Sequence, residues 1–172
     1  RRRRRLARIF ALQFLYQADS GPDYSLDAPR TQAFWDQLKR EEPELGDDDL
    51  AHARTYADHL IRGVIAHLRD LDKRIEAGTR NWTVARMSAI DRNILRLGAY
   101  ELLYVENVPP AVSIDEAVEL AKSFGDTDTP RFVNGILDRL RRDACPPQSP
   151  LRRPPTAVRA KQSHRTRAPS RA

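Results

Sequence analysis

Residues 109–140 constrain the fold most, because their start and stop signals predict two helices joined by a short acidic loop. Ser113 and Glu116 have the spacing of a capping box, in which two side chains satisfy free backbone N–H groups at a helix start. Gly125 is typical of a residue that ends a helix in the left-handed conformation. Thr129 is the expected cap of the second helix. Together these signals predict a pair of helices.

A glycine inside the second predicted helix, Gly135, weakens that helix by about 1 kcal/mol relative to alanine. Helices that keep such a glycine usually need close approach by another backbone, a side chain or a partner. We therefore expect a neighbour to pack against this position.

Apolar residues recur at helical spacing along the rest of the chain, and no window has the alternation typical of strands. Residues 89–106 are apolar nearly all round and predict a helix at the centre of the core. The sequence predicts an all-α protein in which residues 1–143 form a single bundle of about seven helices. The other expected helices cover residues 4–18, the surroundings of Trp35, 50–68 and 71–78, with a loop over 19–31.

The chain carries a net charge of +6, which belongs to its two ends. Residues 1–8 hold six arginines and residues 146–172 hold seven basic side chains, with no acidic residue in either stretch. The body between them has more Asp and Glu than Lys and Arg. Basic ends on an acidic body indicate contact with a polyanion at defined places. Six prolines and few large apolar residues predict that residues 144–172 form a disordered basic tail.

Several functional classes are disfavoured by what the sequence lacks. A single cysteine, Cys145, allows no internal disulfide and suits the reducing cytoplasm, where we expect the protein to act. No apolar run approaches the roughly 20 residues that span a bilayer. His52, His59 and His67 are seven and eight residues apart, too far along a helix to share a metal ion. The sequence has no phosphate-binding loop, nucleophile motif or obvious carboxylate pair, so we expect no enzyme, metal or cofactor.

The arginine-rich start is the strongest candidate for ligand binding. Arg1, Arg4, Arg5 and Arg8 have the i, i+3, i+4 and i+7 spacing that projects side chains from one helix face. Guanidinium groups bind phosphates through paired hydrogen bonds and stack on bases, so such a row can follow a nucleic acid backbone. The alternative is a solvated, charged helix end without a ligand.

Three stretches carry a resemblance to a known family: RRRRRLARIFALQFLYQ at the start, AIDRNILRLGAYELLY in the middle, and residues 109–140. Their order and spacing over most of residues 1–142 resemble the NusB family, the RNA-binding transcription antitermination factors of bacteria. The resemblance implies the helical fold of that family and a role without catalysis.

The resemblance also implies RNA-binding residues. In the family, the arginine-rich motif contacts the boxA RNA element, and this role carries over to Arg4, Arg5 and Arg8. Arg96 is a candidate for extending the RNA path, with a structural ion pair as the alternative. Arg131 is a candidate RNA contact near the protein interface.

A protein interface is implied as well. In the family, the loop before the last helix and the start of that helix form part of the surface that binds NusE, a ribosomal protein. By position, Asp128 and Phe132 are the candidates for this contact, and Tyr16 and Asp91 match family positions on the same surface. The alternatives are ordinary core aromatics for Phe132 and Tyr16, and an N-terminal helix charge for Asp91.

The expected function is that of an RNA-binding antitermination factor. Such a protein binds boxA-like single-stranded RNA with NusE and helps assemble an antitermination complex on RNA polymerase during ribosomal RNA transcription. One alternative is the non-catalytic N-terminal RNA-binding domain of an rRNA cytosine methyltransferase, which the lack of a methyl-donor-binding domain disfavours. Others are a homodimer that hides the RNA surface, as some family members are thought to form, and a nucleic-acid binder without sequence preference.

Overall fold

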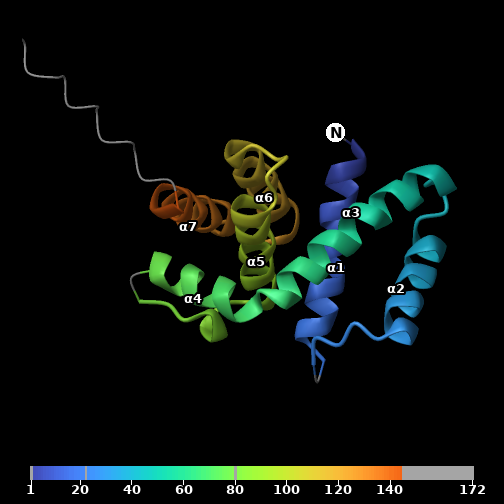
Figure 1. Cartoon of the computed structure of the whole chain (residues 1–172), viewed down its shortest axis with the longest axis horizontal. Coiled ribbons are helices and arrows are strands. Elements are labelled where there is room, and N and C mark those ends of the chain that lie inside the picture. The colour runs from blue at the N-terminus through green and yellow to red at the C-terminus, as the bar shows by residue number, and fades with distance from the viewer. Residues whose placement is uncertain (1, 22, 80, 145–172) are drawn as a thin grey trace, which may run out of the picture.

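Seven α-helices make up the computed structural model, which describes residues 2–21, 23–79 and 81–144 and has no strand in those ranges (Figure 1). The predicted all-α bundle of about seven helices is thereby confirmed. Arg1 and the predicted tail from residue 145 onward lie outside the described residues. The elements are α1 (Arg2–Asp19), α2 (Ala28–Glu41), α3 (Asp47–Ala66), α4 (Leu68–Gly78), the 3-10 helix η1 (Val84–Arg86), α5 (Ala89–Tyr104), α6 (Pro110–Phe124) and α7 (Thr129–Ala144).

Helix α5 lies at the centre of the bundle, as its all-round apolar sequence predicted. Every residue from 93 to 101 is buried, and the helix packs against α1, α3, α4, α6 and α7. Figure 1 shows α5 between the pair α6 and α7 on one side and the pair α1 and α3 on the other. Gly98 permits the close approach of α7, because a Cβ atom there would lie 2.8 Å from Leu137 Cδ1.

Helix α2 lies against α1 through aromatic edges, such as the T-shaped contact of Phe34 with Phe14, whose ring centroids are 5.2 Å apart. The helix begins earlier than predicted, because Asp27 accepts a 2.8 Å hydrogen bond from the backbone N–H of Arg30. Pro29 falls in the first turn, where the missing N–H of a proline is not needed. The loop predicted before this helix was therefore too long.

The α6–α7 pair has the predicted helices but different contacts at their ends. Helix α6 begins at Pro110, so Ser113 and Glu116 lie inside it and form no capping box. The Ser113 hydroxyl has no hydrogen-bond partner among the described residues, and Glu116 pairs with arginines of α1. The capping-box prediction was wrong because α6 begins before Ser113, so the Ser113 N–H already bonds to the Pro109 carbonyl at 3.2 Å.

The turn between α6 and α7 also differs from expectation. Gly125 does follow the end of α6, but its φ of −94° is not in the left-handed region. A Cβ atom there would lie 2.5 Å from Thr129 Cγ2, so the close contact, rather than the backbone conformation, requires glycine. The Thr129 hydroxyl serves the loop and α5 instead of capping α7. It accepts the N–H of Asp126 at 3.0 Å and donates to Asp91 Oδ1 at 2.9 Å.

Gly135 lies on the outside of α7. Apart from the adjacent residues and backbone of α7 itself, no described atom lies within 4 Å of the position that a Cβ would take there. The expected close approach by another part of the chain was thus wrong for the described residues, and a partner is the remaining alternative.

Candidate functional site

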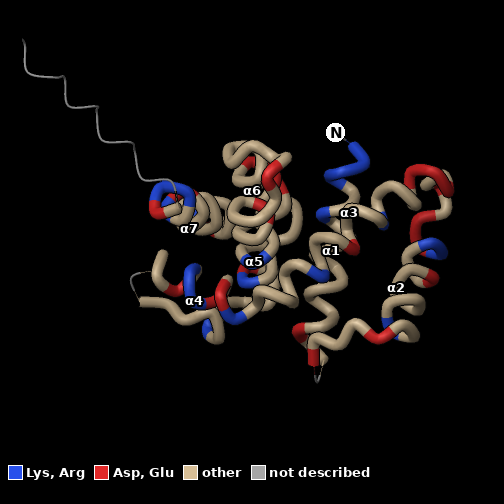
Figure 2. Tube along the Cα trace, in the orientation of Figure 1, with Lys and Arg blue, Asp and Glu red and all other residues tan. Residues whose placement is uncertain are grey.

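The first turns of α1 present arginines to solvent, and Figure 2 shows them as a basic end of that helix. Arg3 is held by the start of α3, with Nη2 at 2.7 Å from Asp48 and Nε at 2.6 Å from Asp49. The guanidinium of Arg4 lies over the Tyr56 ring, 5.1 Å from its centroid. We call residues 2–5 the arginine turn. Its four consecutive side chains are all exposed, so they are not confined to the single helix face that the spacing predicted.

Arg8 is not part of this exposed group, although its spacing predicted the same face. Its side chain is only 5% exposed, with Nη2 2.9 Å from Glu101 Oε1 and Nη1 3.5 Å from Glu116 Oε2. The Tyr56 hydroxyl donates to the same Glu101 carboxylate at 2.5 Å, and burial together with this bond raises the pKa of Tyr56. Arg8 thus fastens α1 to α5 and α6, and the structure does not present it to a ligand.

Arg96 is buried too, with 7% of its side chain exposed. Its Nε and Nη2 atoms form a two-pronged pair with Asp72 at 2.7 and 2.9 Å, and Nη1 lies 3.5 Å from Asp19. The same Nη1 donates to the Tyr24 hydroxyl at 2.7 Å. The structure therefore has the ion pair that the sequence left open, with acidic partners that the sequence did not suggest.

Asp19 is the hub of this second buried cluster. Arg92 Nε lies 2.5 Å and Asn93 Nδ2 3.1 Å from its carboxylate, which also accepts a hydrogen bond from the Tyr24 hydroxyl. Burial alone would raise the pKa of Asp19, but the bonds from Tyr24 and Arg92 outweigh it and lower the pKa. The cluster ties the end of α1 to α5. Sequence reasoning missed it because no local pattern marks a pairing over such a separation.

Because the pKa of Asp19 is lowered in the folded state, the fold should lose stability in acid. The Asp19 carboxylate stabilises the fold at pH values above its ordinary pKa of 3.8, and this contribution is lost as the pH falls through the lower folded value. At pH 6, the wild type should therefore unfold at a higher urea concentration than Asp19→Asn. The difference between their unfolding midpoints should shrink below about pH 4. The control is Asp36→Asn, which replaces an exposed carboxylate of α2 in the same way. A difference that stays constant down to about pH 2 would contradict the assignment.

Three of the predicted partner-binding residues, Asp91, Asp128 and Phe132, are brought together at one hollow of about 510 Å³. Asp91 is fixed at the start of α5, where its N–H donates to the capping Ser88 hydroxyl at 3.0 Å. Because Asp126 and Asp128 also line the hollow, we call it the acidic hollow. The full lining is Trp82, Arg86, Met87, Ser88, Asp91, Asp126, Asp128, Thr129 and Phe132.

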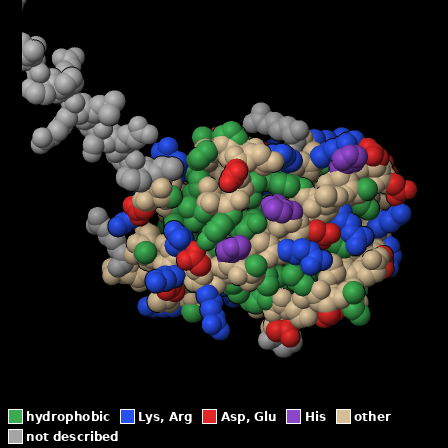
Figure 3. Space-filling model, in the orientation of Figure 1, with side chains coloured by type: hydrophobic (Ala, Val, Ile, Leu, Met, Phe, Trp, Pro, Cys, Tyr) green, Lys and Arg blue, Asp and Glu red, His purple; other side chains and the backbone are tan. Residues whose placement is uncertain are grey.

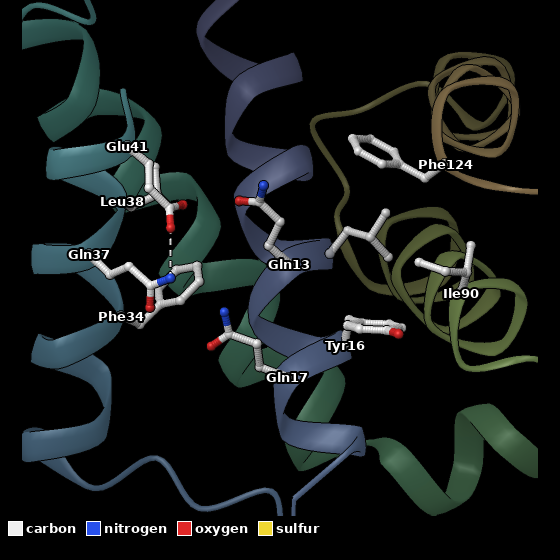
Figure 4. A pocket seen from close by; sticks show the side chains of 10 residues that line it. Gln13, Tyr16, Gln17, Phe34, Gln37, Leu38, Glu41, Ile90 and Phe124 are labelled. Carbon is white, nitrogen blue, oxygen red and sulfur yellow. Dashed lines mark hydrogen bonds between the residues drawn. The ribbon is translucent and has the colours of Figure 1, made fainter. Parts of the chain in front are cut away.

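Tyr16 lines a neighbouring hollow of about 300 Å³ between α1, α2, α5 and α6. Figure 4 shows Tyr16 of α1 facing Ile90 of α5, with Phe124 of α6 nearby. Tyr16 is 43% exposed, so it is not an ordinary core aromatic. Ile90 belongs to this hollow and Asp91 to the acidic hollow. The first turn of α5 therefore lines both hollows, with Tyr16 in one and Asp91, Asp128 and Phe132 in the other.

Trp82 is the functional candidate that sequence reasoning placed only in a link between helices. Its side chain is 53% exposed, and the Arg86 guanidinium lies 5.8 Å from the centroid of its ring. Trp82 lines the acidic hollow and also an adjoining one with Phe132, Arg131 and Gly135. A tryptophan between two helices can indicate a binding residue, but the sequence alone does not show whether its side chain is exposed.

The three histidines of the described residues lie at separate positions along α3 and its C-terminal cap. His52 and His59 are exposed on α3, and His67 is half-buried at its C-terminal cap. Within the described ranges, no group of three or more His, Cys, Asp or Glu is placed to hold a metal ion. None of the helices described is long and apolar enough to cross a bilayer.

Comparisons with known proteins place these features in a family. A model of the NusB family matches residues 5–142. A relative from Geobacter sulfurreducens, named transcription antitermination protein NusB, is 42% identical over 137 residues, which are 80% of this chain and 92% of that protein. The solved structure of T. maritima NusB has a TM-score of 0.63 and 33% identity, and the match covers 83% of this chain and 93% of that one. A chain from a crystal structure of antitermination factors NusB and NusE in complex with dsRNA has a TM-score of 0.65 and 25% identity, over 83% and 98% of the two chains.

Proposed function

Because the chain belongs to the NusB family, we propose that it is an antitermination factor that binds boxA-type single-stranded RNA together with the ribosomal protein NusE. In the cytoplasm, it helps assemble an antitermination complex on RNA polymerase during ribosomal RNA transcription. The observation that carries the proposal is the separation of two surfaces on one rigid bundle. An exposed basic turn suits RNA, and an acidic, aromatic surface suits a basic ribosomal protein.

The RNA contacts are assigned to exposed arginines. Arg4 has no carboxylate within ion-pair distance among the described residues, and its guanidinium carbon lies 5.1 Å from the centroid of the Tyr56 ring. Arg5 reaches only the α6 carboxylates, at 3.3 and 3.6 Å, from a half-exposed position. Arg131 is exposed beside the acidic hollow. Arg8 supports Arg5 from within, because both pair with Glu116, whereas Arg96 holds the far end of α1 through Asp19.

The salt dependence of RNA binding tests this assignment. Replacing both side chains in Arg4→Ala/Arg5→Ala should flatten the slope of log K against log salt by about 1.4, since each phosphate contact on a single strand contributes about 0.7. The control Arg40→Ala/Arg139→Ala removes the same charge from exposed positions on α2 and α7. Equal slopes for the wild type and the α1 variant would exclude phosphate contacts by these two arginines.

NusE is assigned to the surface formed by the two hollows. Its apolar anchors are the exposed Tyr16 and Trp82 and the partly buried Phe132, because aromatic side chains rimmed by charge are typical of binding hot spots. Asp128, exposed at the start of α7, supplies negative charge to a basic partner. Asp91 supports the surface through its bond to Thr129.

The decisive experiment measures binding of fluorescent boxA-type RNA and a scrambled RNA, with and without NusE, at fixed salt. We expect preference for boxA that NusE strengthens. Phe132→Ala/Trp82→Ala should lose this enhancement and keep the affinity for RNA alone, whereas Val112→Ala, which truncates an exposed side chain of α6, should behave as the wild type. Equal binding of both RNAs, unaffected by NusE, would overturn the proposal.

A further inference from the structure

A row of aromatic rings crosses the face formed by α3 and α5, outside the surfaces assigned above. Neighbouring ring centroids along the row are 4.3 to 6.2 Å apart. From Tyr56 to His67, α3 rises by about 16 Å. Figure 3 shows histidine side chains along this face, with hydrophobic side chains between them. In order, the rings of this aromatic row belong to Tyr56, His59, Tyr100, His67 and Tyr104.

The aromatic row begins at the arginine turn. Arg4 lies over its first ring, Tyr56, and a hollow of about 590 Å³ opens at this junction. Arg3, Arg4, Tyr56 and His59 are all among the residues that line this hollow. Its volume is in the range of small-ligand pockets, and its lining combines cationic groups for phosphate with rings for a base.

The carboxylates beside the row are already engaged by the protein. Glu101 accepts the Tyr56 hydroxyl at 2.5 Å, and Asp70 accepts the Tyr104 hydroxyl at 2.6 Å. Each of these carboxylates also binds an arginine. Their charge is therefore compensated beneath the row, while Tyr104, at 36%, and His59 remain exposed. A polyanion on this face meets rings and compensated carboxylates rather than free negative charge.

We propose that the aromatic row and its hollow are the path of the RNA bases, whose phosphates bind the arginine turn. This inference rests on the proposed function and adds the residues that carry the bases. Proteins that bind single-stranded RNA stack bases on tyrosine and histidine rings and on guanidinium planes, next to a cationic groove for the backbone. The accessible rings His59 and Tyr104 follow the arginine turn on one face, and the buried Tyr100 lies between His59 and His67 as a support that no base reaches. This arrangement of guanidinium groups and accessible rings favours RNA over a protein partner.

The test compares a boxA-type RNA with the same strand carrying abasic residues, for the wild type and for His59→Ala/Tyr104→Ala. Each ring removed should weaken binding of the intact RNA about fivefold or more, and the variant should lose the preference of the wild type for the intact strand. The salt slope should stay unchanged, because rings contact no phosphate. Tyr104→Phe, which keeps the ring and loses the bond to Asp70, should bind as the wild type.

Controls separate the possible failures. Val112→Ala truncates an exposed side chain elsewhere, and the single variant His59→Ala, at an exposed position, serves should the double variant unfold. If ring variants bind normally while Arg4→Ala/Arg5→Ala binds weakly, the row is not the base path and the proposed function stands. If the wild type binds no RNA, both proposals fall. If the ring variants change only the sedimentation of the RNA-free protein, the row is a self-association surface and the inference is wrong.

Discussion

Replacing Glu101 with glutamine is expected to lower the free energy of unfolding by about 3 kcal/mol, because it removes one partner of a buried ion pair. Glu101 is 2% exposed and receives both the Arg8 guanidinium and the Tyr56 hydroxyl. In Glu101→Gln, the buried Arg8 retains only Glu116, at 3.5 Å. Urea unfolding followed by far-ultraviolet circular dichroism measures the loss. Since Arg8 fastens α1 to α5 and α6, the same substitution should also disturb the position of the arginine turn.

A matched substitution shows whether burial causes the effect. Glu119→Gln alters an exposed α6 carboxylate that pairs with Arg5 at 3.6 Å, and it should leave the unfolding free energy nearly unchanged. The double variant Arg8→Met/Glu101→Leu should lose less stability than Glu101→Gln, because it leaves no unpaired buried charge. If Glu101→Gln cost no more than Glu119→Gln, the buried pair would not be what holds α1 in place.

Patterns that act within one element were predicted well from the sequence. The central position of α5 followed from its all-round apolar surface, and the ends of α4 and α6 followed from Gly78 and Gly125. Such features depend on residues a few positions apart, which a sequence displays directly. The arginines at the start of α1 were predicted only in part, because helical spacing placed Arg8 on the same face as Arg4 and Arg5, and Arg8 is buried.

Features that depend on distant partners were missed. The spacing of Arg8 is that of an exposed face, and nothing near it in sequence indicates Glu101, 93 positions away. Glu116 was assigned to a capping box from its spacing to Ser113, because nothing near it in sequence indicates the ion pairs of its carboxylate with Arg5 and Arg8 of α1. The exposure of Trp82 also depends on how the link packs, whereas the grouping of Asp91 with Asp128 was expected only from the family resemblance and not from any local pattern. The residue roles at both surfaces therefore needed the structure.

A second large effect is expected at Gly63, where α3 passes beneath the ring of Tyr100. A Cβ atom at this position would lie 1.9 Å from Tyr100 Cζ and 2.2 Å from its hydroxyl oxygen. The ring of this buried tyrosine would have to leave its site in Gly63→Ala. We expect a loss of about 3 kcal/mol in unfolding free energy, at the upper end of the usual cost of overpacking. The aromatic row should be disturbed too, since Tyr100 is its central ring.

Gly135→Ala is the matched substitution, because the same change on α7 meets no atom within 4 Å. Alanine is the better helix former by about 1 kcal/mol, so this variant should be more stable than the wild type. Making Gly63→Ala in a protein that already carries Tyr100→Ala shows whether the tyrosine ring causes the loss of stability. Once the ring is gone, Gly63→Ala should cost nothing further or add stability, as at Gly135. A full loss in that background would mean that the backbone of α3, rather than the tyrosine ring, requires glycine at this position.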